Sequence, residues 1–261
     1  MGDQDMVLFR EENGIALLTL NRPEALNALN MAMLERLFGL LDQVRATDSI
    51  KAAIITGSGT TAFSAGADVR FLNQATPLEV REFARLAVQL NRKIETLGKI
   101  VVAAINGYAI GGGQELAESC MLRIAVPGAK MGHPEVCLGA IGGFGGTTRL
   151  PRLVGKGRAA EMLLRGRLVS GSEALQIGLV QSVVAPENLL AEAKATLCEI
   201  VAHPPIAVRL TWEAIHRGLD MTLEESTLLG ADLFGLVATT EDFRIGTKAF
   251  LEKTTPAYTG K

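Results

Sequence analysis

The chain has 261 residues, of which 48% are hydrophobic and 21% charged, a balance typical of a folded globular protein. Its 26 basic and 28 acidic residues give a net charge of −2, so the composition favours neither nucleic acid nor an anionic membrane as a partner. Three cysteines without a CxxC pair argue against a disulfide framework. The acidic first residues lack the basic and apolar regions of a signal peptide, so we expect a cytoplasmic protein.

Short apolar runs alternate with helical patterns through most of the chain. The runs predict strands over residues 15–20, 52–56, 100–105, 121–126 and 180–184. Helical periodicity predicts helices over residues 31–44 and from Pro77 to about Leu97. Strands separated by helices need crossover connections, so the pattern predicts an α/β fold with largely parallel strand pairing.

From Pro186 onward the pattern is helical only. Helices are expected from Pro186 to about residue 202, and over residues 206–217, 223–237 and 241–253. The last two carry more apolar residues than a solvated appendage needs, which is typical of an interface. The sequence therefore predicts a core over residues 1–195 and a helical C-terminal region over residues 196–261.

Several standard catalytic motifs are absent from the sequence. No GxGxxG follows a predicted strand, and Gly155-Lys156 is followed by glycine, so neither a Rossmann site nor a Walker loop is expected. The histidines and cysteines lack the spacing of zinc ligands, so no metal is expected. Residues 62–66 approach a nucleophile elbow without its first glycine, which leaves Ser64 with His133 as its base as a minor alternative.

Two glycine-rich turns follow predicted strands. One contains Gly111, Gly112 and Gly113 and precedes a helix, and the other covers residues 64–68. Free backbone N–H groups at such turns can bind an oxyanion that develops on a carbonyl. Turns that only allow close packing are the alternative, and residue types do not decide between the two.

Two glutamates stand beside glycine-rich segments. Glu115 lies one turn into the helix after Gly111, and Glu135 precedes the apolar, glycine-rich residues 136–146. A carboxylate in apolar surroundings is costly unless it is paired or functional. Two carboxyl groups that face one volume can hold a water between them. A surface or N-cap position is the alternative for each, because spacing does not prove that they converge.

Seven segments carry a family resemblance. They are residues 21–29 (NRPEALNAL), 63–68 (FSAGAD), 104–115 (AINGYAIGGGQE), 133–135 (HPE), 145–155, 172–180 and 241–250. In this order they resemble the enoyl-CoA hydratase, or crotonase, superfamily over nearly the whole chain. The resemblance implies a spiral of repeated ββα units, followed by helices that assemble homotrimers and pair them into hexamers.

The resemblance also implies an activity, the addition of water across the C2–C3 double bond of a 2-enoyl-CoA thioester. Acyl-CoA would be the substrate, and no separate cofactor is expected. An enoyl- or dienoyl-CoA isomerase, a hydratase of a cyclic dienoyl-CoA, and a CoA-thioester-binding protein without turnover are the alternatives. Acyl-chain length is left open.

Site residues follow from the resemblance position by position. The backbone N–H groups of Ala67 and Gly112 would form an oxyanion hole, Glu115 would activate the water, and Glu135 would deliver a proton to C2. Further substrate or CoA contacts are expected at Ala25, Leu26, Ala65, Asp68, Gly111, Phe144, Phe250 and Lys253. For Phe144, a place in the core without substrate contact is the alternative reading.

Overall fold

The computed structural model describes residues 6–261, which divide into two compact units. The first unit extends to Ala195, and the second covers Thr196–Lys261. Within the described residues, no helix has both the length and the apolar character needed to cross a membrane.

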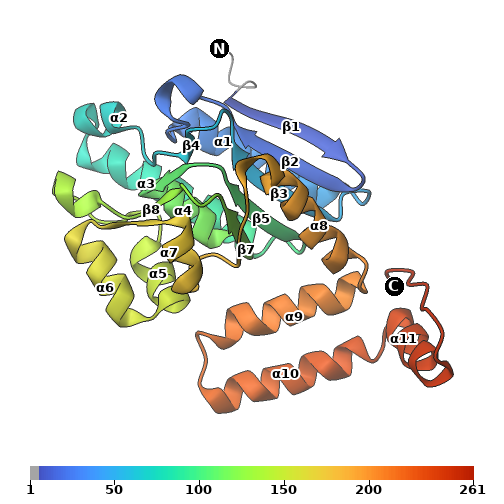
Figure 1. Ribbon diagram of the computed structural model, residues 1–261. Helices are drawn as coiled ribbons and strands as arrows, with labels where there is room; N and C mark the ends of the chain where they lie inside the picture. The colour runs from blue at the N-terminus through green and yellow to red at the C-terminus, as the bar shows by residue number, and fades with distance from the viewer. Residues whose placement is uncertain (1–5) are drawn as a thin grey trace. The chain divides into compact units, whose positions relative to one another are not determined.

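A six-stranded sheet with the order β1-β2-β3-β5-β7-β10 forms the centre of the first unit (Figure 1). Its strands are β1 (Val7–Glu12), β2 (Ile15–Leu20), β3 (Ala52–Gly57), β5 (Ile100–Ile105), β7 (Leu122–Ala125) and β10 (Ser182–Val183). Only β1 and β2 pair antiparallel, as a hairpin, and the other neighbours pair parallel. Every residue of β3 is buried, as expected for a strand covered on both faces.

A second, smaller sheet has the order β4-β6-β8-β9. Its strands are β4 (Ala62–Ser64), β6 (Tyr108–Ile110), β8 (Lys130–Gly132) and β9 (Leu168–Ser170). The first three pair parallel, and β9 pairs antiparallel with β8. Because β4, β6 and β8 directly follow β3, β5 and β7, the chain crosses from the large sheet to the small one and then enters a helix, three times over. This repetition is the predicted spiral of ββα units.

Helices cover the sheets of the first unit. They are η2 (Pro23–Ala25), α1 (Met31–Ala46), α2 (Val69–Gln74), α3 (Pro77–Glu95), α4 (Gly112–Ser119), η3 (Glu135–Leu138), α5 (Gly146–Val154), α6 (Lys156–Arg165), α7 (Gly171–Gln176), η4 (Pro186–Asn188) and α8 (Leu189–Val201), which continues past Ala195. A capping box between Thr76 and Glu79 begins α3. All residues of α4 are buried, so polar side chains on this helix are held away from water.

Three helices make up most of the second unit: α9 (Pro205–Gly218), α10 (Leu223–Val237) and α11 (Glu241–Glu252). Helices α9 and α10 lie side by side (Figure 1). Another capping box, between Thr222 and Glu225, begins α10. Leu228 and Phe234 on this helix are 60% and 67% exposed, which leaves an apolar face uncovered within the chain.

The predicted strands and helices are present, with some differences. The strand expected over residues 180–184 is reduced to Ser182–Val183, and the helix expected from Pro186 begins with a 3-10 turn. Strand β1 and the whole small sheet were not predicted. The small sheet's strands have three residues each, too few to show an alternating pattern.

Candidate active site

The turns after β4 and β6 bring two backbone N–H groups together. Ala67 follows β4 and Gly112 is the first residue of α4. A Cβ atom added to Gly112 would lie 3.4 Å from the Ala67 nitrogen, so the two residues adjoin. Neither N–H donates a hydrogen bond to an acceptor among residues 6–261. Gly66, which directly precedes Ala67, has a φ of +93°, a conformation that glycine adopts without strain.

The segment before α1 fixes the turn that contains Ala67. The Leu29 N–H donates to Gly66 O at 2.7 Å, and the Ala65 N–H donates to Leu26 O at 2.9 Å. These bonds place Leu26 beside Ala65, two of the positions expected to contact CoA, and Ala25 directly precedes Leu26.

Asp68 has structural partners of its own. Its Oδ2 lies 3.1 Å from an Arg22 nitrogen, and its Oδ1 accepts the Arg70 N–H at 3.1 Å, which caps α2. Arg22 also donates to Ala28 O, so the pair ties the turn after β4 to the preceding segment. The Asp68 carboxylate therefore stabilises the turn that presents Ala67.

Glu115 is a buried carboxyl at the centre of α4. Its side chain reaches the segment before α5, where Oε1 accepts the N–H groups of Phe144 at 2.9 Å and Gly146 at 2.7 Å. Burial raises the pKa of Glu115 to about 7, although the Gly146 N–H and the nearby His133 oppose the rise. The carboxyl is thus suited to exchanging a proton near neutral pH.

Glu135 begins η3 and is half-buried. A Cβ atom added to Gly111 would lie 3.0 Å from Glu135 Oε1, so this carboxyl lies against the turn that precedes α4. Side-chain oxygen and nitrogen atoms of Glu115, His133 and Glu135 lie within 4.8 Å of one another. The structure therefore brings Glu115 and Glu135 to one volume, beside Gly112.

His133 connects this volume to a further buried acid. Its Nε2 lies 2.8 Å from Glu118 Oε1, and its Nδ1 lies 3.8 Å from Glu135 Oε1. Burial favours a neutral ring, but Glu118 and Glu135 raise the pKa of His133 to about 10. A metal ion would have to displace a proton from this ring, so the raised pKa of His133 opposes a metal at the Glu115–His133–Glu135 group.

Sequence reasoning missed Glu118. It stands three residues after Glu115 on α4 and therefore on the same face of the helix, which was the available signal. The Ser64 alternative has no support, since Ser64 Oγ accepts the Gly66 N–H and no hydrogen bond joins it to His133 in the described chain.

Phe144 lies over the N-terminus of α4. The residue is 5% exposed, and its ring meets the ring of Phe83 edge-on, at 5.3 Å between centroids. A Cβ atom added to Gly112 would lie 2.6 Å from the Phe144 ring, so the ring packs directly on that glycine. The Phe144 carbonyl accepts from Asn91 and Arg149, both at 3.0 Å. Phe144 therefore borders the turn, while its backbone positions Glu115.

Comparisons with known proteins agree on one family. Residues 10–261 match the enoyl-CoA hydratase/isomerase family. The chain belongs to that family. Crotonyl-CoA hydratase of Syntrophomonas wolfei is 44% identical over 97% of both chains, and short-chain-enoyl-CoA hydratase of Clostridium acetobutylicum is 40% identical over 95% of both. A crystal structure of enoyl-CoA hydratase from Bacillus anthracis superposes with a TM-score of 0.94 at 37% identity, covering 98% of this chain and 100% of that one.

These matches confirm the resemblance and the crotonase-like fold that the sequence predicts for this enoyl-CoA hydratase/isomerase family member. The contacts expected at Phe250 and Lys253 concern the second unit. Phe250 is 84% exposed, so it does not anchor α11 by packing. Lys253 ends α11 in the left-handed conformation, with a φ of +55°.

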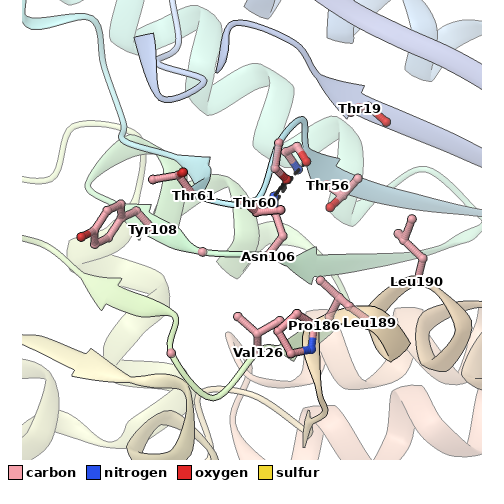
Figure 2. A pocket seen from close by; sticks show the side chains of 14 residues that line it. Thr19, Thr56, Thr60, Thr61, Asn106, Tyr108, Val126, Pro186, Leu189 and Leu190 are labelled. Atoms are coloured by element: carbon pink, nitrogen blue, oxygen red, sulfur yellow. Dashed lines mark hydrogen bonds between the residues drawn. The ribbon is translucent and has the colours of Figure 1, made fainter. Parts of the chain in front are cut away.

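A cavity of about 570 Å³ lies apart from the residues described above (Figure 2). Figure 2 shows Pro186, Leu189 and Leu190 on one side of it and Thr56 and Thr60 on the other. No carboxyl, imidazole or thiol lines it, and none of the site residues predicted from the sequence does. The candidate acid–base groups are therefore Glu115 on α4 and Glu135 on η3, and not residues that line this cavity.

Proposed function

We propose that this chain is an enoyl-CoA hydratase, which adds water across the C2–C3 double bond of a 2-enoyl-CoA thioester to give the 3-hydroxyacyl-CoA. One observation carries the proposal. Two carboxyl groups, Glu115 and Glu135, face a common volume beside the unpaired N–H groups of Ala67 and Gly112.

The two amides would bind the thioester carbonyl oxygen. As water adds at C3, negative charge moves to this oxygen, and donors fixed in place before the reaction stabilise it. Ala67 and Gly112 belong to turns held by backbone hydrogen bonds and close packing, so little reorganisation is needed when the charge develops.

The glutamates would divide the proton transfers. Ionised Glu115 takes a proton from the water as its oxygen bonds to C3, and protonated Glu135 gives a proton to C2. After the reaction Glu115 carries a proton taken from the water and Glu135 has lost one to C2, and proton exchange with solvent resets the pair. Because the two groups share one volume, the negative charge of Glu135 raises the pKa of Glu115.

Two acids favour hydration over isomerisation. An isomerase moves a proton between carbons and leaves no water in the product, so a single acid–base group suffices. Here both carboxyl groups lie within reach of one small molecule held between them. Hydration is therefore the function that the site supports best.

Crotonyl-CoA is the first substrate to test, because the relatives named above act on crotonyl-CoA and short-chain enoyl-CoA. Incubation should remove the absorbance of the conjugated double bond and add the mass of one water to the product. Loss of absorbance without added mass would contradict the proposal. A series of thioesters with longer, branched and cyclic acyl groups would then define the acyl preference.

The second unit has an assembly role in this proposal. Apolar side chains of α10 and α11 are exposed within the chain, among them Phe234, Leu236 and Phe250. We expect them to be covered in a homotrimer, with two trimers forming a hexamer, and we expect Phe250 and Lys253 to contact CoA. The enzyme should be cytoplasmic and need no cofactor beyond the CoA of its substrate.

Truncation after Val237 tests this assembly role. The shortened protein should form smaller species in light scattering and bind CoA more weakly in calorimetry. A truncated protein that stays hexameric and binds CoA normally would contradict the role.

A further inference from the structure

A row of three buried polar side chains leads away from Glu135. Its members are His133, Glu118 and Gln114. His133 lies between Glu118 and Glu135, 2.8 Å from the first carboxyl and 3.8 Å from the second. The side chains of His133 and Glu118 are fully buried. Gln114, one turn earlier on α4, donates its amide to the same Glu118 oxygen at 3.1 Å. The row thus leads from the middle of a buried helix to a carboxyl of the candidate site.

This arrangement has no evident part in holding the fold together. Neither the Glu118 nor the His133 side chain hydrogen-bonds a backbone group among the described residues, so they cap no helix and close no turn. A buried ion pair is weak evidence for stability, since desolvation offsets most of the attraction. The row costs free energy in a core that apolar side chains could fill, which points to a use in the reaction.

Other charges near His133 are engaged elsewhere. The groups that face it are Glu115 and Glu118 from α4 and Glu135 from η3, with Arg149 of α5 and Arg123 of β7 close to the same acids. Arg149 donates to both carboxylate oxygens of Glu95 on α3. Arg123 donates to the carbonyls of Leu179 and Cys120. His133 is therefore the cation that faces Glu135.

We propose that Glu118 and His133 are positioning residues, which hold a positive charge against the Glu115–Glu135 pair and so keep the base of the reaction ionised. The proposal rests on the hydratase function, because it assigns the charge a part in that reaction. Glu118 acts through His133, because its negative charge keeps both ring nitrogens of His133 protonated. Neither residue needs to touch the substrate.

The direction of the effect follows from the charges. The positive ring of His133 lowers the pKa of Glu115, against the burial that raises it to about 7. Loss of the ring's charge should raise the pKa of the base further, because an opposite charge at this range stabilises the ionised form. The acid limb of the pH profile, where kcat/KM falls as Glu115 becomes protonated, should then move to higher pH.

Glu118→Gln tests the idea with little change of shape, because the amide oxygen can still accept from His133 and from Gln114. The acid limb of kcat/KM for crotonyl-CoA should move to higher pH by up to about one unit, because loss of the His133 charge raises the pKa of Glu115 more than loss of the Glu118 charge lowers it, and the maximal kcat should stay within roughly twofold of the unmodified enzyme. His133→Gln removes the positive charge and leaves the Glu118 carboxyl in place, so it should move the limb at least as far, and the double variant should move it no further than His133→Gln. Ser119→Ala, at a buried neighbour on α4 whose hydroxyl bonds Leu116 O, should leave the limb in place.

A second measurement does not depend on turnover. The chain has three histidines, so the ring of His133 can be followed by NMR beside the exposed His203 and the half-buried His216. His133 should stay protonated through neutral pH and become neutral there in the Glu118→Gln variant.

The outcomes separate the two proposals. A folded Glu118→Gln variant with an unchanged limb, or with an equal loss of kcat at every pH, would overturn the positioning role, as would a neutral His133 in the unmodified protein. A protein that shows a protonated His133 but hydrates no enoyl-CoA would overturn the hydratase function, and the positioning role with it, while leaving the ion pair established.

Discussion

The two carboxyl groups of the site lie in different surroundings. Glu115 is on a helix buried at every position, and two backbone N–H groups hold one of its oxygens. Glu135 is half-buried on a short 3-10 helix, and the residues that follow it expose apolar side chains, with Leu138 at 67% and Ile141 at 75%. One side of the site is fixed by the core, and the other is open to solvent. Side chains on the open side can vary at little cost to folding, so differences in acyl preference are expected there.

The largest effect should come from removing either acid. Glu115→Gln and Glu135→Gln should each lower kcat on crotonyl-CoA by about 100-fold or more, because an amide cannot exchange the proton. Both losses should be similar despite the different burial, and the double variant should be far less than additive, since in the proposed mechanism the groups act on one water. Steady-state kinetics measure this, with Glu161→Gln on the exposed face of α6 as the control. Normal turnover in either single variant would remove that residue from the proposed mechanism.

The pH dependence of kcat/KM should reflect the titration of Glu115, the buried carboxyl of the site. The pKa of Glu115 is raised to about 7, so the ionised fraction of this base falls as pH drops through neutrality. Below that point kcat/KM should decrease about tenfold per pH unit. A profile that stays flat down to about pH 5 would show that the base is not the raised carboxyl. Dialysis against a chelator should leave the profile unchanged, because the proposed reaction uses only carboxyl groups and backbone amides.

Crowding at Gly112 should have an intermediate effect. A Cβ atom there would lie 2.6 Å from the Phe144 ring, so Gly112→Ala should displace the ring or the turn. Kinetics should show a loss of kcat on the order of tenfold, with a lower Tm, since overpacking and a misplaced oxyanion donor act together. Adding Phe144→Leu should restore part of both. Full activity in Gly112→Ala would show that close packing of the Phe144 ring on Gly112 is not needed for turnover.

The smallest effect should come from Ile141, on the solvent-exposed side of the site that follows Glu135. Ile141→Ser should change stability by about 0.5 kcal/mol or less, because the side chain is already solvated. Relative kcat/KM across acyl chains of increasing length should shift a few-fold, on the order of 1 kcal/mol for each methylene group of the substrate that no longer packs against an apolar side chain. Leu164→Ser on α6, at 77% exposure, is the matched control and should change neither quantity. An unchanged profile in Ile141→Ser would place the acyl group elsewhere.

Sequence reasoning succeeded where a pattern is local. The strand ending at Ile105, the glycine turn and the position of Glu115 one turn into a helix could all be inferred from adjoining residues. It failed for the small sheet, whose three-residue strands depend on pairing between distant segments. The pairing of Glu118 with His133 escaped notice for a related reason, since 15 positions separate two groups that only the fold brings together. The family resemblance supplied the spiral itself.

The small sheet also determines how well the candidate site can accommodate amino-acid substitutions. Ser64, Ile110 and Gly132 end three parallel strands, and Ala67, Gly112 and Glu135 each follow within a few residues. Main-chain hydrogen bonds align these strand ends, so the spacing of the reacting groups depends little on which side chains the strands carry. Side chains substituted at the turns would keep the same spacing, because the strands that position them are unchanged. We therefore expect that substitutions at these turns can change the side chains of the candidate site while the backbone amides of Ala67 and Gly112 keep their places.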